Sequence, residues 1–118
     1  MGTPARVVVL PVATAALRVE SLELPDPGPH QVVVKQFASG ICHSQLHQMH
    51  TPRRRPVVLG HESTGVVLQV GSEVTHVVAG DTVMVTWVPR QATSASIPPE
   101  PARLEVSDGT AVSQNVFT

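Results

Sequence analysis

The stretch "GHESTGVVLQVGSEV", residues 60 to 74, joins a short polar opening to a segment rich in valine. Residues 63 to 71 within it predict a strand, because valines recur there and a glycine ends the run. His61 and Glu62 stand directly before that strand. They supply an imidazole and a carboxylate, two of the side-chain types that bind zinc. The stretch therefore predicts a strand with potential metal ligands at its start.

Valine pairs and triplets like those of this strand recur along the chain. They lie at residues 7–9, 32–34, 57–58, 66–67 and 77–78. Stiff β-branched side chains pack well on a pleated sheet, and the 11 Pro and 8 Gly fit many turns. A chain of 118 residues suffices for one ordinary domain. The composition therefore predicts a mainly β fold.

Strand and turn signals divide the chain into short elements. Strands are predicted at residues 5–10, 17–24, 31–40, 63–71 and 81–88. A short helix is predicted over residues 42–50, because this segment holds no Pro, Gly or β-branched residue and Pro52 follows it. Three less regular segments complete the chain: an exposed loop at 51–56, a flexible loop at 90–104, and a weak hairpin at 105–118 whose tip is Asp108-Gly109.

Charge and cysteine content exclude several classes of protein. The net charge of −1 gives no electrostatic footprint for nucleic acid. The single cysteine excludes an internal disulfide and favours a reducing, cytoplasmic compartment. No apolar run reaches the ~20 residues of a membrane span. Residues 6–16, "RVVVLPVATAA", imitate a signal peptide, but Pro11 and the lone Arg6 favour a first strand.

Two sets of residues could bind a metal. The first is Cys42, His61 and Glu62, although their spacing is not that of a zinc finger. From spacing alone, structural roles are favoured, with Cys42 as a small buried residue and His61 as a hydrogen-bonded turn residue. The second set is His43, His47 and His50, which would share one face of the predicted helix. A solvated face is the simpler interpretation of His50.

The full pattern from Gly60 resembles the signature of the zinc-dependent, medium-chain alcohol dehydrogenases. That signature is Gly-His-Glu, two residues, Gly, five residues, Gly or Ala, two residues, and then a small or aliphatic residue. The matching positions are Gly60, His61, Glu62, Gly65, Gly71 and Val74, without a mismatch. Upstream, "SGICHS" resembles the first-ligand segment of the family, and downstream "AGDTVMV" resembles its Gly-Asp-x-Val strand. The resemblance covers about residues 5 to 89.

The resemblance implies a partly open, GroES-like β-barrel with one short helix. Residues 1–89 would form the core of this catalytic domain, and residues 90–104 would replace a structural-zinc lobe. Residues 105–118 would form a return hairpin of the same domain, with the chain truncated before a nucleotide-binding domain.

The resemblance also implies roles for seven residues. They are Cys42, His61 and Glu62 as zinc ligands, Ser44 and His47 as the substrate-side hydroxyl and the end of a proton relay, His43 facing the cofactor pyrophosphate, and Trp87 as an aromatic wall of the substrate pocket. The implied activity is interconversion of an alcohol and an aldehyde, with hydride transfer to NAD or NADP. The partners are a small-molecule alcohol or aldehyde, with no nucleic acid and no membrane, and the full-length protein is expected to form a homo-oligomer.

The chain departs from the family pattern in ways that bear on activity. The third zinc ligand is missing, and no Gly-x-Gly cofactor fingerprint occurs, so this chain alone is expected to be inactive. Gln45 stands where relatives carry an Asp that orients the ligand histidine, a role worth ~10–100-fold in affinity or activity. The residues of the 90–104 segment include no Cys or His, so they cannot hold a structural zinc.

Two other functions stay open on the sequence. One is a zinc-independent relative such as a quinone reductase, which the pairing of Cys42 with Gly-His-Glu disfavours. The other is a GroES-like binding module without chemistry, because a fold does not decide function. The run Arg53–Arg55 is either a solvated loop or a positive rim at the substrate entrance that favours an anionic substrate.

Overall fold

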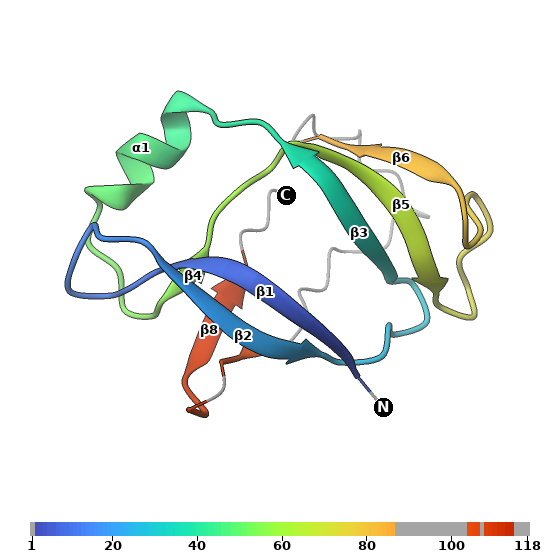
Figure 1. Ribbon diagram of the computed structural model, residues 1–118, viewed down its shortest axis with the longest axis horizontal. Helices are drawn as coiled ribbons and strands as arrows, with labels where there is room; N and C mark the ends of the chain where they lie inside the picture. Colours follow the sequence, from blue (N-terminus) through green and yellow to red (C-terminus); the bar gives the residue numbers. More distant parts are fainter. Residues whose placement is uncertain (1, 87–103, 107, 115–118) are drawn as a thin grey trace, which may run out of the picture. The chain divides into compact units, whose positions relative to one another are not determined.

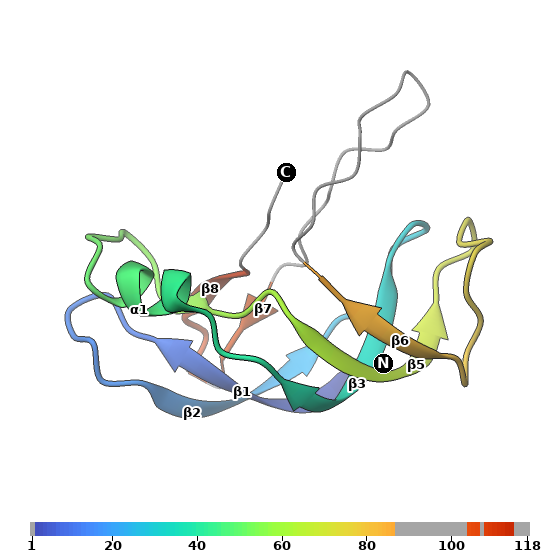
Figure 2. The same ribbon diagram turned by 90° about the horizontal axis from the view of Figure 1, so that it is seen from above.

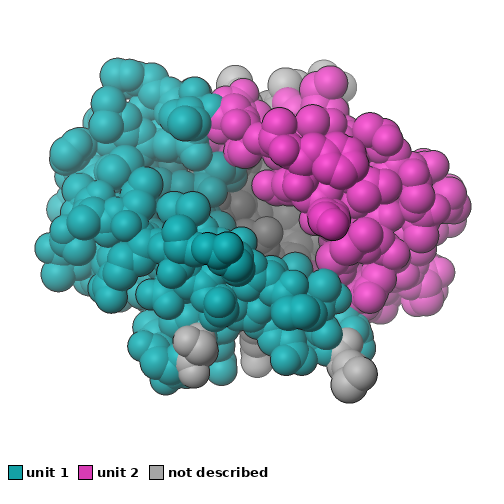
Figure 3. Space-filling view, in the orientation of Figure 1, with its two compact units in different colours: residues 1–26, 41–60, 101–116 teal, residues 27–40, 61–100, 117–118 magenta. Residues whose placement is uncertain are grey.

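The computed structural model describes residues 2–86, 104–106 and 108–114 (Figure 1 and Figure 2). The chain divides into two compact units, coloured separately in Figure 3. Unit 1 comprises residues 1–26, 41–60 and 101–116, and unit 2 comprises residues 27–40, 61–100 and 117–118. Each unit therefore combines segments that are far apart in the sequence.

Unit 1 contains a five-stranded sheet. Its strands are β1 (Thr3–Leu10), β2 (Arg18–Leu24), β4 (Val57–Val58), β7 (Leu104–Glu105) and β8 (Ala111–Gln114), in the spatial order β2-β1-β4-β8-β7 (Figure 1). β1 and β2 form an antiparallel hairpin with Thr3 opposite Leu24, whereas β4 runs parallel to β8. A bridge from Leu22 in β2 to Val106 after β7 connects the two edges of the sheet. The sheet is thus rolled toward a barrel that is only partly closed.

The core of unit 1 follows from alternation along these strands. In β1, every second residue turns inward, so Val7 and Val9 are more buried than Val8, which is 49% exposed. The buried cluster joins residues from both ends of the chain: Val9, Leu22, Leu104, Val106 and Val112. Burial of such side chains stabilises each by about 1.5–3 kcal/mol relative to exposure.

Unit 2 contains a three-stranded antiparallel sheet. Its strands are β3 (Val32–Ser39), β5 (Ser63–Val70) and β6 (Thr82–Val85), which lie side by side in the order β3-β5-β6 (Figure 2). The register of β3 against β5 shifts between Val33 and Val34 and again between Gln36 and Ala38. Such irregularities bend a strand and increase its twist.

Two glycines of the 60–74 stretch are required because backbone lies directly against them. A Cβ at Gly65 would clash with the Lys35 carbonyl oxygen of β3, and one at Gly71 would clash with the carbonyl oxygens of Gly28 and Pro29. The turn at Gly71 is held by hydrogen bonds from its N–H to the Gln31 carbonyl oxygen (2.8 Å) and from the Glu73 N–H to the Pro29 carbonyl oxygen (2.8 Å). The glycine spacing therefore reflects close packing of chain on chain.

The structure confirms a mainly β, partly open fold with one short helix, α1 (His43–Met49). The predicted hairpin tip is also present, with β7 antiparallel to β8 and Gly109 at φ +84. β4 is not among the predicted strands, because two residues give no periodic signal and its partners come from β1 and β8. The described part of the chain contains no helix long and apolar enough to cross a membrane.

The predicted flexible loop at 90–104 lies outside the described residues except for Leu104. That residue begins β7 and is 5% exposed, so it belongs to the core of unit 1. The end of the strand predicted at 81–88 also lies outside them, and β6 ends at Val85.

Candidate active site

The start of helix α1 is organised around Cys42. This residue is the N-cap, half-buried, with extended backbone angles of φ −104 and ψ 147. The Gln45 side-chain oxygen accepts the Cys42 backbone N–H at 2.7 Å, and the Gln45 backbone N–H donates to the Cys42 carbonyl oxygen at 3.0 Å. The bond to the Gln45 side chain belongs to a capping box, in which the Cys42 side chain also accepts the Gln45 backbone N–H, and the box satisfies backbone donors left open at a helix start. Cys42 is therefore held at a defined position by Gln45.

Helix α1 presents Ser44 and His47 on its surface. Both are exposed, and no residue of the helix is buried. Because they are three positions apart, their side chains are neighbours on the helix surface. The helix ends at Met49, where the Thr51 hydroxyl donates to the His47 carbonyl oxygen at 3.0 Å. A hydroxyl and an imidazole are thus adjacent just after the candidate zinc ligand Cys42.

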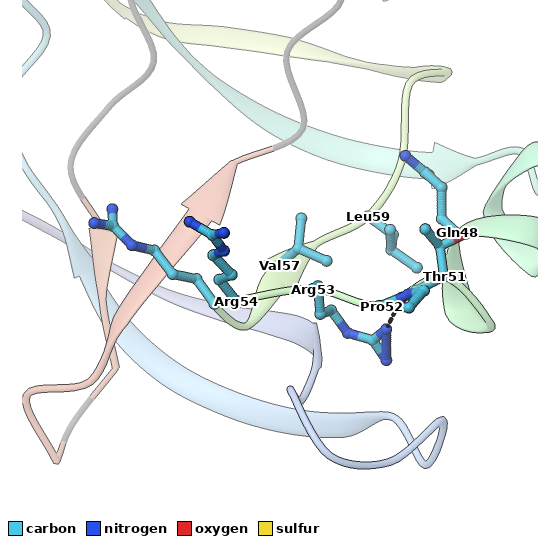
Figure 4. A pocket seen from close by; sticks show the side chains of 8 residues that line it. Gln48, Thr51, Pro52, Arg53, Arg54, Val57 and Leu59 are labelled. Carbon is cyan, nitrogen blue, oxygen red and sulfur yellow. Dashed lines mark hydrogen bonds between the residues drawn. The ribbon is translucent and has the colours of Figure 1, made fainter.

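The far end of α1 is attached to the rest of unit 1 by Arg53. Its Nε donates to the Pro11 carbonyl oxygen at 2.7 Å, and its Nη2 donates to the Thr14 carbonyl oxygen at 3.1 Å. The same guanidinium donates to the Thr51 carbonyl oxygen at 2.8 Å (Figure 4) and to the Met49 carbonyl oxygen at 3.3 Å. Since no residue of α1 is fully buried, hydrogen bonds at its two ends help to hold it in place.

His61 follows a glycine whose conformation other residues avoid. Gly60 has φ +122, a region that side-chain-bearing residues rarely occupy. His61 is 8% exposed, and in the described part of the chain it is the one polar or charged residue among the buried ones. The glycine of the Gly-His-Glu motif therefore makes the backbone turn that precedes a buried imidazole.

Glu62 is placed by the end of strand β3. Its carbonyl oxygen accepts hydrogen bonds from the Gly40 N–H and the Ser39 hydroxyl, each at 3.1 Å. Its carboxylate lies over Gly40, where an added Cβ would come within 2.6 Å of Glu62 Cδ. The absence of a side chain at Gly40 thus leaves the space that the carboxylate occupies.

The donor types of Cys42, His61 and Glu62 suit zinc, which binds thiolate, imidazole and carboxylate. Cys42 belongs to unit 1, whereas His61 and Glu62 belong to unit 2, so their zinc-ligand roles stay predictions. No three Cys, His, Asp or Glu side chains gather as a metal site within residues 2–86, 104–106 and 108–114. The alternative site of His43, His47 and His50 is accordingly not assembled there.

The remaining predicted residues divide into exposed and undescribed ones. His43 is the first residue of α1 and is exposed. Trp87 lies outside the described residues. The sequence predicts Gln45 only as a neighbour of the zinc ligands, whereas the structure shows that it also caps α1. A glutamine at the third position of a helix is the sequence signal for such a cap. The role of Arg53 has no local signal, because two of its carbonyl partners lie about forty residues away, at separations of 42 and 39.

Comparison with known proteins gives a family match across most of the chain. The model of the alcohol dehydrogenase GroES-like domain matches residues 28–110. The chain belongs to this family. The match includes α1 and the whole Gly60–Val74 stretch, which carry most of the candidate site residues.

Three relatives show how far the similarity extends. Alcohol dehydrogenase from Moraxella sp. (strain TAE123) is 40% identical over 77 residues, covering 62% of this chain and 23% of the relative. Sorbitol dehydrogenase from Gallus gallus is 40% identical over 82 residues, covering 64% and 23%. Sorbitol dehydrogenase from Homo sapiens is 40% identical over 75 residues, covering 58% and 21%. The GroES-like chain spans less than a quarter of the length of these relatives.

Proposed function

We propose that this chain is the N-terminal, substrate- and zinc-binding part of an oxidoreductase that interconverts alcohols and aldehydes. The observation that carries the proposal is the arrangement of α1, which begins at a capped Cys42 and presents Ser44 and His47 as neighbours. The names of the relatives, alcohol dehydrogenase and sorbitol dehydrogenase, support the same reaction class.

Cys42 and His61 would hold a zinc ion, with Glu62 as an alternate ligand or close neighbour. When bound, zinc acts as a Lewis acid on the alcohol oxygen and favours its deprotonation near neutral pH. The Cys42 thiol must release its proton to serve as a ligand. The burial of His61 limits water around one ligand, and the Glu62 carboxylate, which lies over Gly40, would leave that position to reach the metal.

Ser44 and His47 would move the proton that the alcohol releases. The Ser44 hydroxyl accepts that proton while it donates its own toward His47, so the hydroxyl is unchanged after the transfer. His47 is exposed, so its imidazole can release the proton to solvent. The order substrate, Ser44, His47, solvent runs along a single helical turn.

Hydride transfer would use NAD or NADP bound by a nucleotide-binding domain that these residues do not encode. His43, exposed at the start of α1, would face the cofactor pyrophosphate. Trp87 would form an aromatic wall of the substrate pocket. We further propose that the whole enzyme is a homo-oligomer and that it is cytoplasmic, the latter because a ligand thiol must stay reduced.

The proposal is tested in two proteins. The complete polypeptide should contain zinc and reduce NAD or NADP with a simple alcohol, and Cys42→Ser and His47→Gln should each lower kcat/KM by at least about a hundredfold. The present chain alone should neither bind NADH measurably nor oxidise alcohols, because it lacks the Gly-rich turn of a pyrophosphate site. A zinc-free complete polypeptide that reduces quinones would contradict the proposal.

A further inference from the structure

An open pocket of about 490 Å³ adjoins the C-terminal end of α1 (Figure 4). All of its lining residues fall within residues 48–59, inside unit 1. Half-buried Val57 and Leu59 supply an apolar surface, while Gln48 and Thr51 supply polar groups from the helix end. The pocket therefore combines an apolar surface with hydrogen-bonding groups, as small-molecule sites do.

The charge of this pocket is concentrated and of one sign. Three of the chain's eight Lys and Arg residues lie in it, at 53–55, although the net charge of the chain is −1. Among the residues that the structure describes, no acidic side chain lines the pocket. An anion would therefore meet attraction without a competing carboxylate.

The three arginines differ in their hydrogen-bond partners. The Arg53 guanidinium donates hydrogen bonds to backbone carbonyl oxygens. Figure 4 shows that its side chain leaves the backbone in a different direction from that of Arg54. Arg54 and Arg55 are exposed, and neither is paired with an acidic residue in the described part of the chain. Their donors remain available to a ligand, and the guanidinium fork matches the geometry of carboxylate and phosphate.

We propose that Arg54 and Arg55 bind a carboxylate or phosphate group of the substrate, so that the enzyme acts on an anionic alcohol or aldehyde. This inference rests on the proposed function, in which Ser44 contacts the reacting hydroxyl. Gln48 lies one helical turn beyond Ser44 on the same face, about 6 Å along the axis. Because Gln48 lines the pocket and Ser44 does not, a substrate that reaches from Ser44 to the two arginines would carry its anion several carbons from its hydroxyl.

A phosphate of the cofactor offers the same chemistry as an anionic substrate. A neutral alcohol of the same length distinguishes these two sources of the anion. A substrate site selects an acid over the uncharged molecule of the same length, whereas a cofactor site is occupied by NADPH and does not distinguish the substrates.

The test measures binding by amide chemical shifts of the present chain. The probes are ω-hydroxyhexanoate, hexanediol with a hydroxyl at each end, inorganic phosphate and NADPH. We expect saturable shifts at Gln48 and Thr51 with the hydroxy acid and not with the diol. Arg54→Gln combined with Arg55→Gln should weaken this binding about fivefold or more, since each exposed ion pair is worth a modest factor. Arg6→Gln, an exposed charge change on β1, should leave it unchanged.

Several outcomes would overturn the assignment. These are equal binding of acid and diol, equal binding of inorganic phosphate and hydroxy acid, displacement of the acid by NADPH, and an affinity insensitive to the two arginine changes. None of these measurements depends on catalysis. Oxidation of a neutral alcohol by the complete polypeptide reports on the proposed function alone, so failure of either idea is recognised separately.

Discussion

Gly40 and Gly60 lie beside the candidate zinc ligands and are needed for different reasons. At Gly40, an added Cβ would meet the end of the Glu62 side chain, which can move aside. At Gly60, the nearest atom to an added Cβ is Gln45 Nε2 at 3.7 Å, so there is space, but φ is +122. The first glycine therefore places a functional group, and the second permits a backbone turn.

These two roles predict losses of stability of different size for the same substitution. Gly40→Ala should lower the free energy of unfolding by less than about 1 kcal/mol, while it displaces the Glu62 carboxylate and changes its NMR signal. Gly60→Ala should cost about 1–3 kcal/mol, because alanine is strained at that backbone angle. Urea unfolding of the two variants compares them directly. Equal losses of stability would refute the distinction.

Helix α1 is short and has no buried side chain, so its position depends on its ends. An isolated helix of this length is unstable in water. Gln45 satisfies a donor at the start, and Arg53 gathers carbonyl oxygens at the end. The hydrogen bonds of Gln45 and Arg53 therefore hold the two ends of α1, whereas most helices are held by packing of buried side chains.

Arg53→Lys should lower the free energy of unfolding by about 1–3 kcal/mol, since an ammonium cannot reach the four carbonyl oxygens that the planar fork serves. Arg54→Lys, one residue away, should change it by less than about 0.5 kcal/mol. Urea unfolding gives both values, and hydrogen exchange of the α1 amides shows whether the helix is loosened. Equal stability and equal hydrogen exchange of the two variants would show that the Arg53 hydrogen bonds do not hold α1.

The β7–β8 hairpin should respond to acid through Asp108. Hydrogen bonds with Thr110, including its backbone N–H at 2.8 Å from Oδ1, lower the pKa of Asp108 below its usual value. A lowered pKa in the folded state means that the ionised carboxylate stabilises the hairpin. That stabilisation is complete above the ordinary pKa of about 3.9 and disappears as the pH falls through the lower, folded value. Carboxyl NMR titration measures the shift, and Asp108→Asn should abolish this part of the pH dependence; an Asp108 pKa at or above the ordinary value would contradict it.

At the scale of the whole molecule, the candidate zinc ligands are shared between two compact units. Cys42 is held by the cap of α1 in unit 1, and Glu62 is held by the end of β3 in unit 2. These two candidate ligands are therefore positioned by hydrogen bonds within their own units, and these bonds do not require a metal.

Zinc should bind the present chain weakly, because these residues supply two or three ligands and Cys42 must lose a proton. Cys42→Ala should reduce the zinc affinity by at least about tenfold, since even a residue that only orients a ligand is worth about that much. Calorimetric titration with zinc measures both proteins, and Arg6→Gln serves as a control. Tight stoichiometric binding that survives Cys42→Ala would transfer the site to His43, His47 and His50.

The sequence by itself determined the elements whose signals are local. Valine-rich runs predict β1, β3 and β5, and the absence of Pro, Gly and β-branched residues predicts α1, since strand and helix preferences act over neighbouring residues. The glycine pattern from Gly60 to Val74 likewise identifies the family. Only the tertiary structure decided that Val57 and Val58 form a strand and that Arg53, unlike Arg54, binds backbone. Their partners come from distant parts of the chain, and the position of a carbonyl oxygen forty residues away is set by the completed fold.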